Sequence, residues 1–161
     1  MPSPVGHALG GIAAGWAVAP RRDRLTAALL AAVAIAPDLD LLFGTHREAS
    51  HSVGAAAIAG IAAALVARRG RARWGAAVAL TWVSHVFLDW LSNDTRPPLG
   101  VMALWPMSHD YYKAAIEIFP PVSRRYWESR FWLYNLRAIA MELVTLGPLA
   151  GLVLWRVRRA R

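Results

Sequence analysis

The sequence predicts an all-α fold: a membrane-embedded bundle of about five transmembrane or partly inserted helices, forming a single domain over residues 1–161. Composition is the first reason. Of the 161 residues, 57% are hydrophobic and only 17% are charged, and the mean hydropathy is +0.34. That is too apolar for an ordinary soluble domain. The second reason is a set of separate apolar runs rich in Ala and Leu, which lack the alternating pattern of strands.

Five apolar runs account for the predicted helices. They cover residues 8–19, 25–36, 53–67, 74–91 and 138–155. A full span needs about 20 apolar residues, so the first three runs are short and favour partial insertion or helices that extend through polar neighbours. Residues 122–137 mix arginines with aromatic residues. This mixture predicts an amphipathic helix on the membrane surface, or a helix packed over the site.

The basic residues predict a topology. Eleven of the eighteen Lys and Arg lie in three clusters, at 21–24, 68–73 and 156–161, each at the end of an apolar run. Cytoplasmic loops carry such an excess of positive charge. We therefore expect a multi-pass protein of the cell (inner) membrane, with its N-terminus outside and its C-terminus cytoplasmic. Because the charge is distributed in this way, the lipid bilayer is the expected partner, and nucleic acid is not.

The histidines and most acidic residues gather at the helix ends opposite the basic clusters. All five histidines and nine of the ten acidic residues fall there, and only Asp23 lies on the basic side. His85 and Asp89, four residues apart in an apolar run, would share one helix face. Ionisable groups within a membrane are costly and are functional candidates. With no cysteine in the chain, a metal site there would use His and carboxylate ligands, which suit zinc and also manganese or iron.

Each element of this pattern also has a structural interpretation. His85 and Asp89 could be a buried, mutually satisfied pair, and "PDLD" at 37–40 could be a helix terminator and cap. Arg47 could pair with Glu48 in solvent, and Glu142 could be a buried partner of an arginine such as Arg137. In the functional interpretation, Pro37 ends the preceding helix and both following aspartates turn inward at the bend. The segregation of these residues to one side favours the functional interpretation.

Five motifs resemble one family. "GH" at 6–7, "PDLD" at 37–40, "HREASHS" at 46–52, "SHVFLD" at 84–89 and "GVMALWPMS" at 100–108 occur in the order seen in the YdjM-like family of membrane-bound metal-dependent hydrolases. The resemblance covers about residues 6–112. That family is remotely similar to the all-helical zinc-dependent phospholipase C and P1 nuclease group, whose members hold up to three zinc ions and cleave phosphoesters.

The resemblance implies a role for each matching residue. His7 would be the ligand from the first helix, one of Asp38 and Asp40 the aspartate ligand, and His51 its neighbour. His85 would be a ligand from the helix that also carries Asp89, and Asp89 would bridge two metals. His46 would be a ligand or support one, and Arg47 would clamp a phosphate. The implied metal ligands are therefore His7, Asp38, Asp40, His46, His51, His85 and Asp89, and the implied catalytic residues are Asp40, Arg47 and Asp89.

Together these observations predict a membrane-bound metal-dependent hydrolase holding one to three divalent ions, zinc first. A divalent metal lowers the pKa of its bound water to about 7 and so supplies a nucleophile near neutral pH. The expected substrate is a phosphoester, either a phospholipid or a lipid-linked phosphodiester, cleaved at an extracytoplasmic site. The alternative is a non-enzymatic multi-pass protein, an ion translocator or a metal-binding scaffold. A translocator should place polar groups near mid-bilayer with access from both faces.

Overall fold

The computed structural model of the chain describes residues 1–43, 46–95 and 97–159. The predicted basic cluster at 156–161 therefore extends past the described residues. Within them the fold is all-helical, with isolated bridges in place of strands. The five predicted helices are present, and two short 3-10 helices lie between the second and third. In order, the elements are α1 (Pro4–Trp16), α2 (Arg24–Ile35), η1 (Ala36–Phe43), η2 (Ala49–His51), α3 (Val53–Val66), α4 (Arg71–Trp90) and α5 (Phe131–Arg159).

Local sequence signals fix where three helices begin. The side chain of Ser3 accepts a hydrogen bond from the Gly6 N–H at the start of α1. Asp23 caps α2 and Ser52 caps α3 in the same way. Short polar side chains at this position satisfy backbone donors that have no partner within the helix. The cap of α3 directly follows His51, so this signal also fixes the position of that histidine.

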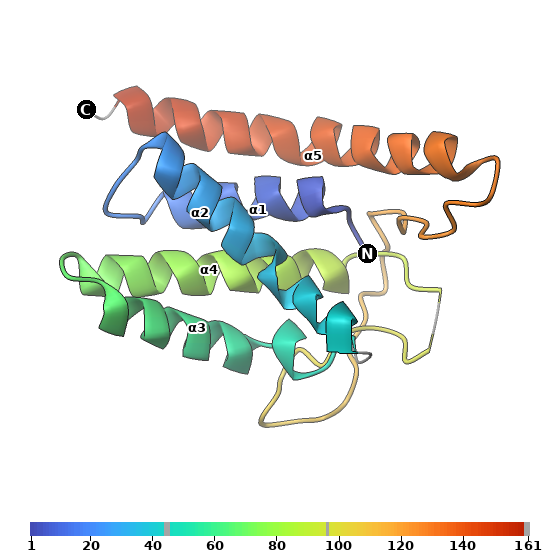
Figure 1. Ribbon diagram of the computed structural model, residues 1–161, viewed down its shortest axis with the longest axis horizontal. Helices are drawn as coiled ribbons and strands as arrows, with labels where there is room; N and C mark the ends of the chain where they lie inside the picture. Colours follow the sequence, from blue (N-terminus) through green and yellow to red (C-terminus); the bar gives the residue numbers. More distant parts are fainter. Residues whose placement is uncertain (44–45, 96, 160–161) are drawn as a thin grey trace.

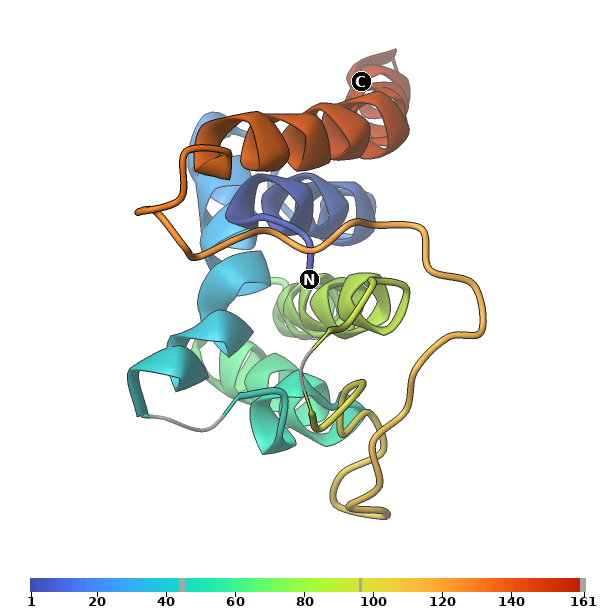
Figure 2. The same cartoon turned by 90° about the vertical axis from the view of Figure 1, so that its right-hand side faces the viewer.

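Helix α1 lies at the centre of the bundle, where it packs against α2, α4 and α5, while α3 packs along α4 (Figures 1 and 2). Close packing depends on small residues on α1. A Cβ at Gly11 would lie 2.3 Å from the Ala34 Cβ, and one at Gly15 would lie 2.2 Å from the Thr81 Oγ1. Only glycine permits these approaches, a common device at helix contacts in membranes.

The two ends of the bundle differ in chemistry. At one end, an apolar core of Trp16, Leu30 and Ala77 includes Leu154 near the end of α5. There Arg73 donates hydrogen bonds from Nε and Nη2 to backbone carbonyls of the α1–α2 connection, at 3.0 and 3.1 Å. The first two basic clusters therefore lie side by side, at the end of the bundle where α5 also ends (Figure 1). The predicted placement of these two clusters at one end is confirmed.

The helices differ in whether they are long and apolar enough to cross a membrane. The segments Arg24–Phe43, which joins α2 to η1, and Phe131–Arg156 are long and apolar enough to cross a membrane. Helices α1 and α3 have 13 and 14 residues, or about 20 Å at 1.5 Å per residue, against a hydrocarbon core of about 30 Å. Full crossing by five helices therefore stays a prediction. Large apolar side chains are exposed along the bundle, among them Leu25, Leu65 and Val144, at 70–77%, as a lipid-facing surface requires.

The predicted surface helix over residues 122–137 is wrong. Residues 120–130 form turns and extended chain, and residues 131–137 are the first turns of α5. Pro121 disfavours a helical conformation in the residue before it, Pro120. The amide of Asn135 then holds the preceding chain, accepting a hydrogen bond from the Ser123 N–H at 2.7 Å and donating one to the Ser123 carbonyl at 3.0 Å. This segment is a loop folded back against the start of α5.

Candidate metal centre

His85 and Asp89 lie on one face of α4, and that face points into the bundle. His85 is fully buried and Asp89 is 4% exposed. The His85 Nε2 and the Asp89 Oδ2 are 3.3 Å apart. Trp82 flanks the same face, and its Nε1 donates a hydrogen bond to the Ser50 carbonyl at 2.8 Å. Because Ser50 precedes His51, this bond ties the histidine segment to α4.

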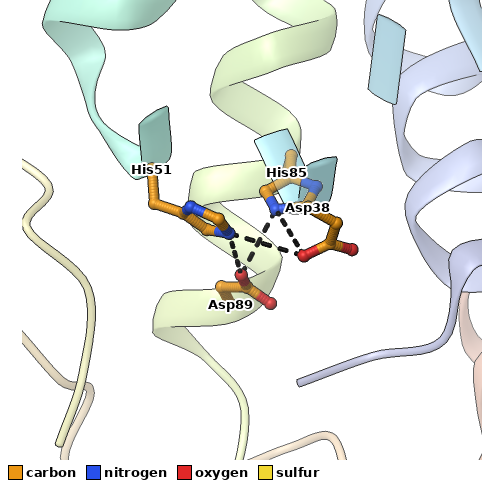
Figure 3. A group of neighbouring side chains, drawn as sticks. All are labelled: Asp38, His51, His85 and Asp89. Atoms are coloured by element: carbon orange, nitrogen blue, oxygen red, sulfur yellow. Dashed lines mark ion pairs between the residues drawn. The ribbon is translucent and has the colours of Figure 1, made fainter. Parts of the chain in front are cut away.

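Two further side chains converge on this pair (Figure 3). Asp38 comes from η1 and His51 from η2. The His51 Nε2 lies 3.3 Å from the Asp89 Oδ2 and 3.5 Å from the Asp38 Oδ1. The His85 Nε2 lies 3.7 Å from the same Asp38 oxygen. Four donor atoms from three elements therefore surround one point.

His7 on α1 joins the group from the other side of Asp89. Its Nε2 lies 3.4 Å from the Asp89 Oδ1, and its ring stacks on that of His85 with centroids 3.8 Å apart. The two oxygens of Asp89 thus face different histidines, which is the arrangement a bridging carboxylate requires. The predicted convergence is confirmed, with one aspartate from "PDLD": five side chains from α1, η1, η2 and α4 meet at one end of the bundle.

The spacing of the donor atoms suits a tetrahedral cation. Four ligand atoms about 2.0–2.1 Å from a common centre lie about 3.3–3.4 Å from one another. The four contacts among Asp38, His51, His85 and Asp89 measure 3.3–3.7 Å. Only small movements of these side chains would therefore bring each atom to zinc-binding distance.

The same atoms lack hydrogen-bond partners in the described part of the chain. Buried polar atoms normally have a partner, and an unsatisfied one is costly. A mutually satisfied pair would show a hydrogen bond between His85 and Asp89, but their contact does not have that geometry. A divalent cation would satisfy the unpartnered atoms, which include His7 Nε2, Asp38 Oδ1, His51 Nε2, His85 Nε2 and both carboxylate oxygens of Asp89.

Hydrogen bonds to the other ring nitrogens orient two of the histidines. The His85 Nδ1 is 2.7 Å from the Ala34 carbonyl. Because a carbonyl only accepts, the Nδ1 carries the proton and the Nε2 lone pair faces the cluster. The His51 Nδ1 lies 3.1 Å from the Asp40 Oδ2 and 3.0 Å from the Ser50 Oγ. Such outer contacts fix the tautomer and ring orientation of metal-binding histidines.

Asp40 and His46 lie one layer further out. Asp40 also contacts His46 Nδ1 at 2.7 Å and accepts from Ser50 Oγ at 2.7 Å. Asp40, His46 and His51 form a second set with ligand atoms close enough to hold a cation, but Asp40 already has protein partners. The expectation that at least one aspartate of "PDLD" joins the cluster is confirmed, and a ligand role for Asp40 stays a prediction. Asp38 faces the cluster, and Asp40 supports His51.

The charge on His46 and His51, which lie outside the α-helices, follows from these contacts. Burial lowers the pKa of His51, but the neighbouring carboxylates of Asp38 and Asp40 outweigh it and raise the pKa to about 9. Burial also lowers the pKa of His46, against the opposing effect of Asp40. His51 is therefore stabilised as a cation among carboxylates. A divalent ion would replace that proton, because a metal ligand must be deprotonated.

Comparison with known proteins places the chain in a family. The family model described as YdjM inner membrane protein matches residues 1–159. The chain belongs to the YdjM inner membrane protein family. No curated protein and no solved structure matches it. The membrane assignment thus has support independent of composition, and the predicted similarity to zinc-dependent phospholipase C stays a prediction.

Arg47 of this YdjM-family chain is fixed beside the cluster. Its backbone has φ of +69°, a left-handed conformation that non-glycine residues seldom adopt and that is often found at functional sites. Its N–H donates to the Asp40 Oδ2 at 3.2 Å, and its guanidinium forms an ion pair with Asp94. Asp94 is held in turn by the Gly100 N–H at 2.8 Å. No local sequence pattern indicates Asp94, and the partner expected for Arg47 in a structural role was Glu48.

Other candidates lie away from the five converging side chains. His109 is exposed in the loop after α4. Glu142 is fully buried, but its partner is Ser3 and not Arg137: its carboxylate accepts from the Ser3 N–H at 2.6 Å and from the Ser3 hydroxyl. Because Ser3 caps the helix that carries His7, Glu142 anchors that histidine from α5.

Proposed function

We propose that this inner membrane protein is a metal-dependent hydrolase that cleaves phosphoesters. The observation that carries the proposal is the convergence of four buried side chains and the half-buried Asp38, whose facing atoms lack hydrogen-bond partners among the described residues. A bound divalent cation would supply a Lewis acid and lower the pKa of its water to about 7. Zinc fits three imidazoles and two carboxylates best, with manganese and iron as alternatives.

The residues of the chain have separate roles in this proposal. His7, Asp38, His51, His85 and Asp89 hold the cation, and Asp40 orients His51. Hydrolysis joins the oxygen of water to phosphorus and breaks the bond to the leaving oxygen, which takes up a proton. Arg47, held by Asp94, neutralises charge on the phosphoryl oxygens, the role for which a guanidinium is suited.

The position of the cluster favours a lipid or lipid-linked substrate over ion translocation. The cluster lies at one end of the bundle, and the opposite end is closed by the apolar core around Trp16 and Leu30. A translocator needs polar groups accessible from both faces. By the positive-inside rule, the basic end is cytoplasmic and the metal centre is extracytoplasmic. A reporter fused after Arg161 should therefore be cytoplasmic, and an extracytoplasmic reporter would contradict this topology.

Hydrolysis by purified protein tests the function. The protein in detergent is incubated with zinc or manganese and bis-p-nitrophenyl phosphate, a chromogenic phosphodiester, and with a phospholipid in mixed micelles. We expect metal-dependent release of product, lost in Asp89→Asn and in His85→Ala. The control is Glu117→Gln, at a surface ion pair with Lys113, which should keep full activity. Equal activity in all four proteins, or its absence from metal-loaded parent protein on every phosphoester, would contradict the proposal.

A further inference from the structure

A cavity of about 670 Å³ adjoins the metal centre. On the side of the cluster its lining includes His46 and Arg47, and the His46 ring lies 4.9 Å from that of His51. On the other side the lining is the loop before α5 and the first turn of that helix. Cavities of this size are typical of small-molecule sites.

The loop that forms the outer wall is fixed near its start by three hydrogen bonds. The Val122 N–H donates to the Met1 carbonyl at 3.2 Å, so the chain passes beside the start of α1 (Figure 2). Asn135 on α5 holds Ser123 through two hydrogen bonds. The cavity is thus a built feature between the cluster and α5.

Positive charge predominates in this cavity. Its lining contains Arg47, Arg124, Arg125 and Arg130 against two acidic residues. Both acids are already paired: Asp94 with Arg47, and Glu128 with Arg125 at 3.0 Å. The side chains of Arg124 and Arg130 make no ion pair with any described residue. Two guanidinium groups therefore remain available to bind an anion, and guanidinium groups bind phosphate through paired hydrogen bonds.

The cavity lies at the expected depth of lipid headgroups. Arg130 immediately precedes Phe131, where the apolar segment Phe131–Arg156 begins. Beside the arginines, Tyr126, Trp127 and Trp132 are 70–76% exposed. Tyrosine and tryptophan gather at the boundary between hydrocarbon and water. A ligand of this cavity can therefore keep its acyl chains in the bilayer while its headgroup faces the arginines.

We propose that this cavity binds the phosphate of a lipid headgroup bearing at least two negative charges, a phosphomonoester or a diphosphate, and that such lipids are the substrates of the adjoining metal centre. The second statement rests on the proposed hydrolase function, whereas the first does not. Zwitterionic headgroups are disfavoured because their ammonium group would lie among arginines. The arginines bind and position the lipid, and the cation-binding residues act on the phosphoester.

Lipid binding is measured first on protein freed of metal with a chelator, in dodecyl maltoside. The ligands are dihexanoyl phosphatidic acid, dihexanoyl phosphatidylcholine and inorganic pyrophosphate, each titrated by calorimetry. We expect phosphatidic acid to bind most tightly of the three. Its affinity should fall as the salt concentration is raised, since salt screens exposed charges. Equal binding of phosphatidylcholine would overturn the anion site, and equal binding of pyrophosphate would overturn the assignment to a lipid.

Matched variants locate the site. Arg124→Gln/Arg130→Gln should weaken phosphatidic acid binding about tenfold or more, because charge-assisted hydrogen bonds are lost. Arg124→Lys/Arg130→Lys keeps the charge and should keep the preference over phosphatidylcholine. The control Arg68→Gln/Arg69→Gln removes the same amount of charge from the α3–α4 connection at the other end of the bundle (Figure 1). This variant should bind phosphatidic acid as tightly as the parent protein does. An equal loss in this control would overturn the location.

Metal analysis of the same proteins separates this proposal from the hydrolase. Both glutamine variants should keep bound metal, and Asp89→Asn should lose metal yet bind phosphatidic acid. Protein that binds the lipid but holds no metal would refute the hydrolase and leave the anion site intact. Protein that holds metal but does not discriminate between the two lipids would refute the anion site alone.

Discussion

Asp40→Asn distinguishes a metal ligand from a residue that orients one. Asp40 contacts His46 Nδ1 and Ser50 Oγ at 2.7 Å, His51 Nδ1 at 3.1 Å and the Arg47 N–H at 3.2 Å. An amide has one oxygen and cannot accept all four. His51 would lose part of its orientation and basicity, while its Nε2 would still face the cluster. We therefore expect metal to bind, but more weakly.

The size of the effect follows from the position of Asp40. Loss of a carboxylate that supports a metal-binding histidine lowers metal affinity about 10–100-fold, or about 1.4–2.8 kcal/mol. The matched control is Asp38→Asn two residues earlier, whose Oδ1 faces the Nε2 atoms of His51 and His85 directly. That change removes a proposed ligand and should lower the metal affinity much more than Asp40→Asn does.

Zinc affinity of the purified proteins is measured by competition with a fluorescent chelator. The expected order is parent, then Asp40→Asn, then Asp38→Asn, with all three folded by size-exclusion chromatography. If Asp40→Asn loses zinc as completely as Asp38→Asn, Asp40 is itself a ligand. If its affinity equals that of the parent, Asp40 does not orient His51. Either result would refute the assignment of Asp40 to the outer layer.

Three further predictions concern stability. The pKa of His51 is raised from its ordinary 6.5 to about 9, so its contribution to folding stability is fully present below pH 6.5 and is lost as pH rises through 9. The melting temperature of metal-free protein should therefore fall over this range. An unchanged melting temperature would contradict the prediction. Glu142→Ala leaves the buried N–H and hydroxyl of Ser3 without a partner and should lower the free energy of unfolding by about 1–3 kcal/mol, measured by thermal unfolding. An equal loss of stability in the control Glu128→Ala, at an exposed position, would contradict the anchoring role of Glu142. Gly11→Ala places a Cβ 2.3 Å from the Ala34 Cβ and should lower both the melting temperature and the zinc affinity. The control Gly147→Ala, where nothing lies within 4 Å of the added Cβ, should change neither. Equal effects of the two changes would show that close packing at Gly11 is not required.

Local sequence signals predicted the parts of the structure that depend on local geometry. His85 and Asp89 share a face because they are four apart on a helix. His51 directly precedes the run at 53–67 that was predicted to be a helix, and it lies just before α3. The placement of the histidines and most acidic residues opposite the basic clusters anticipated that Asp38 and His7 would join them. These inferences need only helix period and charge distribution.

The remaining features depend on contacts that no local pattern records. Asp38 and Asp40 face different ways because they lie in a 3-10 helix. With three residues per turn, positions two apart point in different directions, whereas the sequence suggested a bend with both turned inward. Arg47 pairs with Asp94 across 47 residues. The loop before α5 is fixed by Asn135, a contact that amphipathic periodicity did not predict.

Bound metal in Asp89→Asn protein tests the central claim most directly. The change keeps nearly the same shape and removes the charge of the carboxylate whose two oxygens lie 3.3 and 3.4 Å from facing histidine nitrogens. Parent and variant are purified from membranes under the same conditions, checked for folding, and analysed for metal by mass spectrometry. The metal-centre account predicts a folded variant with little or no bound metal beside a parent that retains it. Normal metal occupancy in folded Asp89→Asn, or a parent without metal, would contradict it.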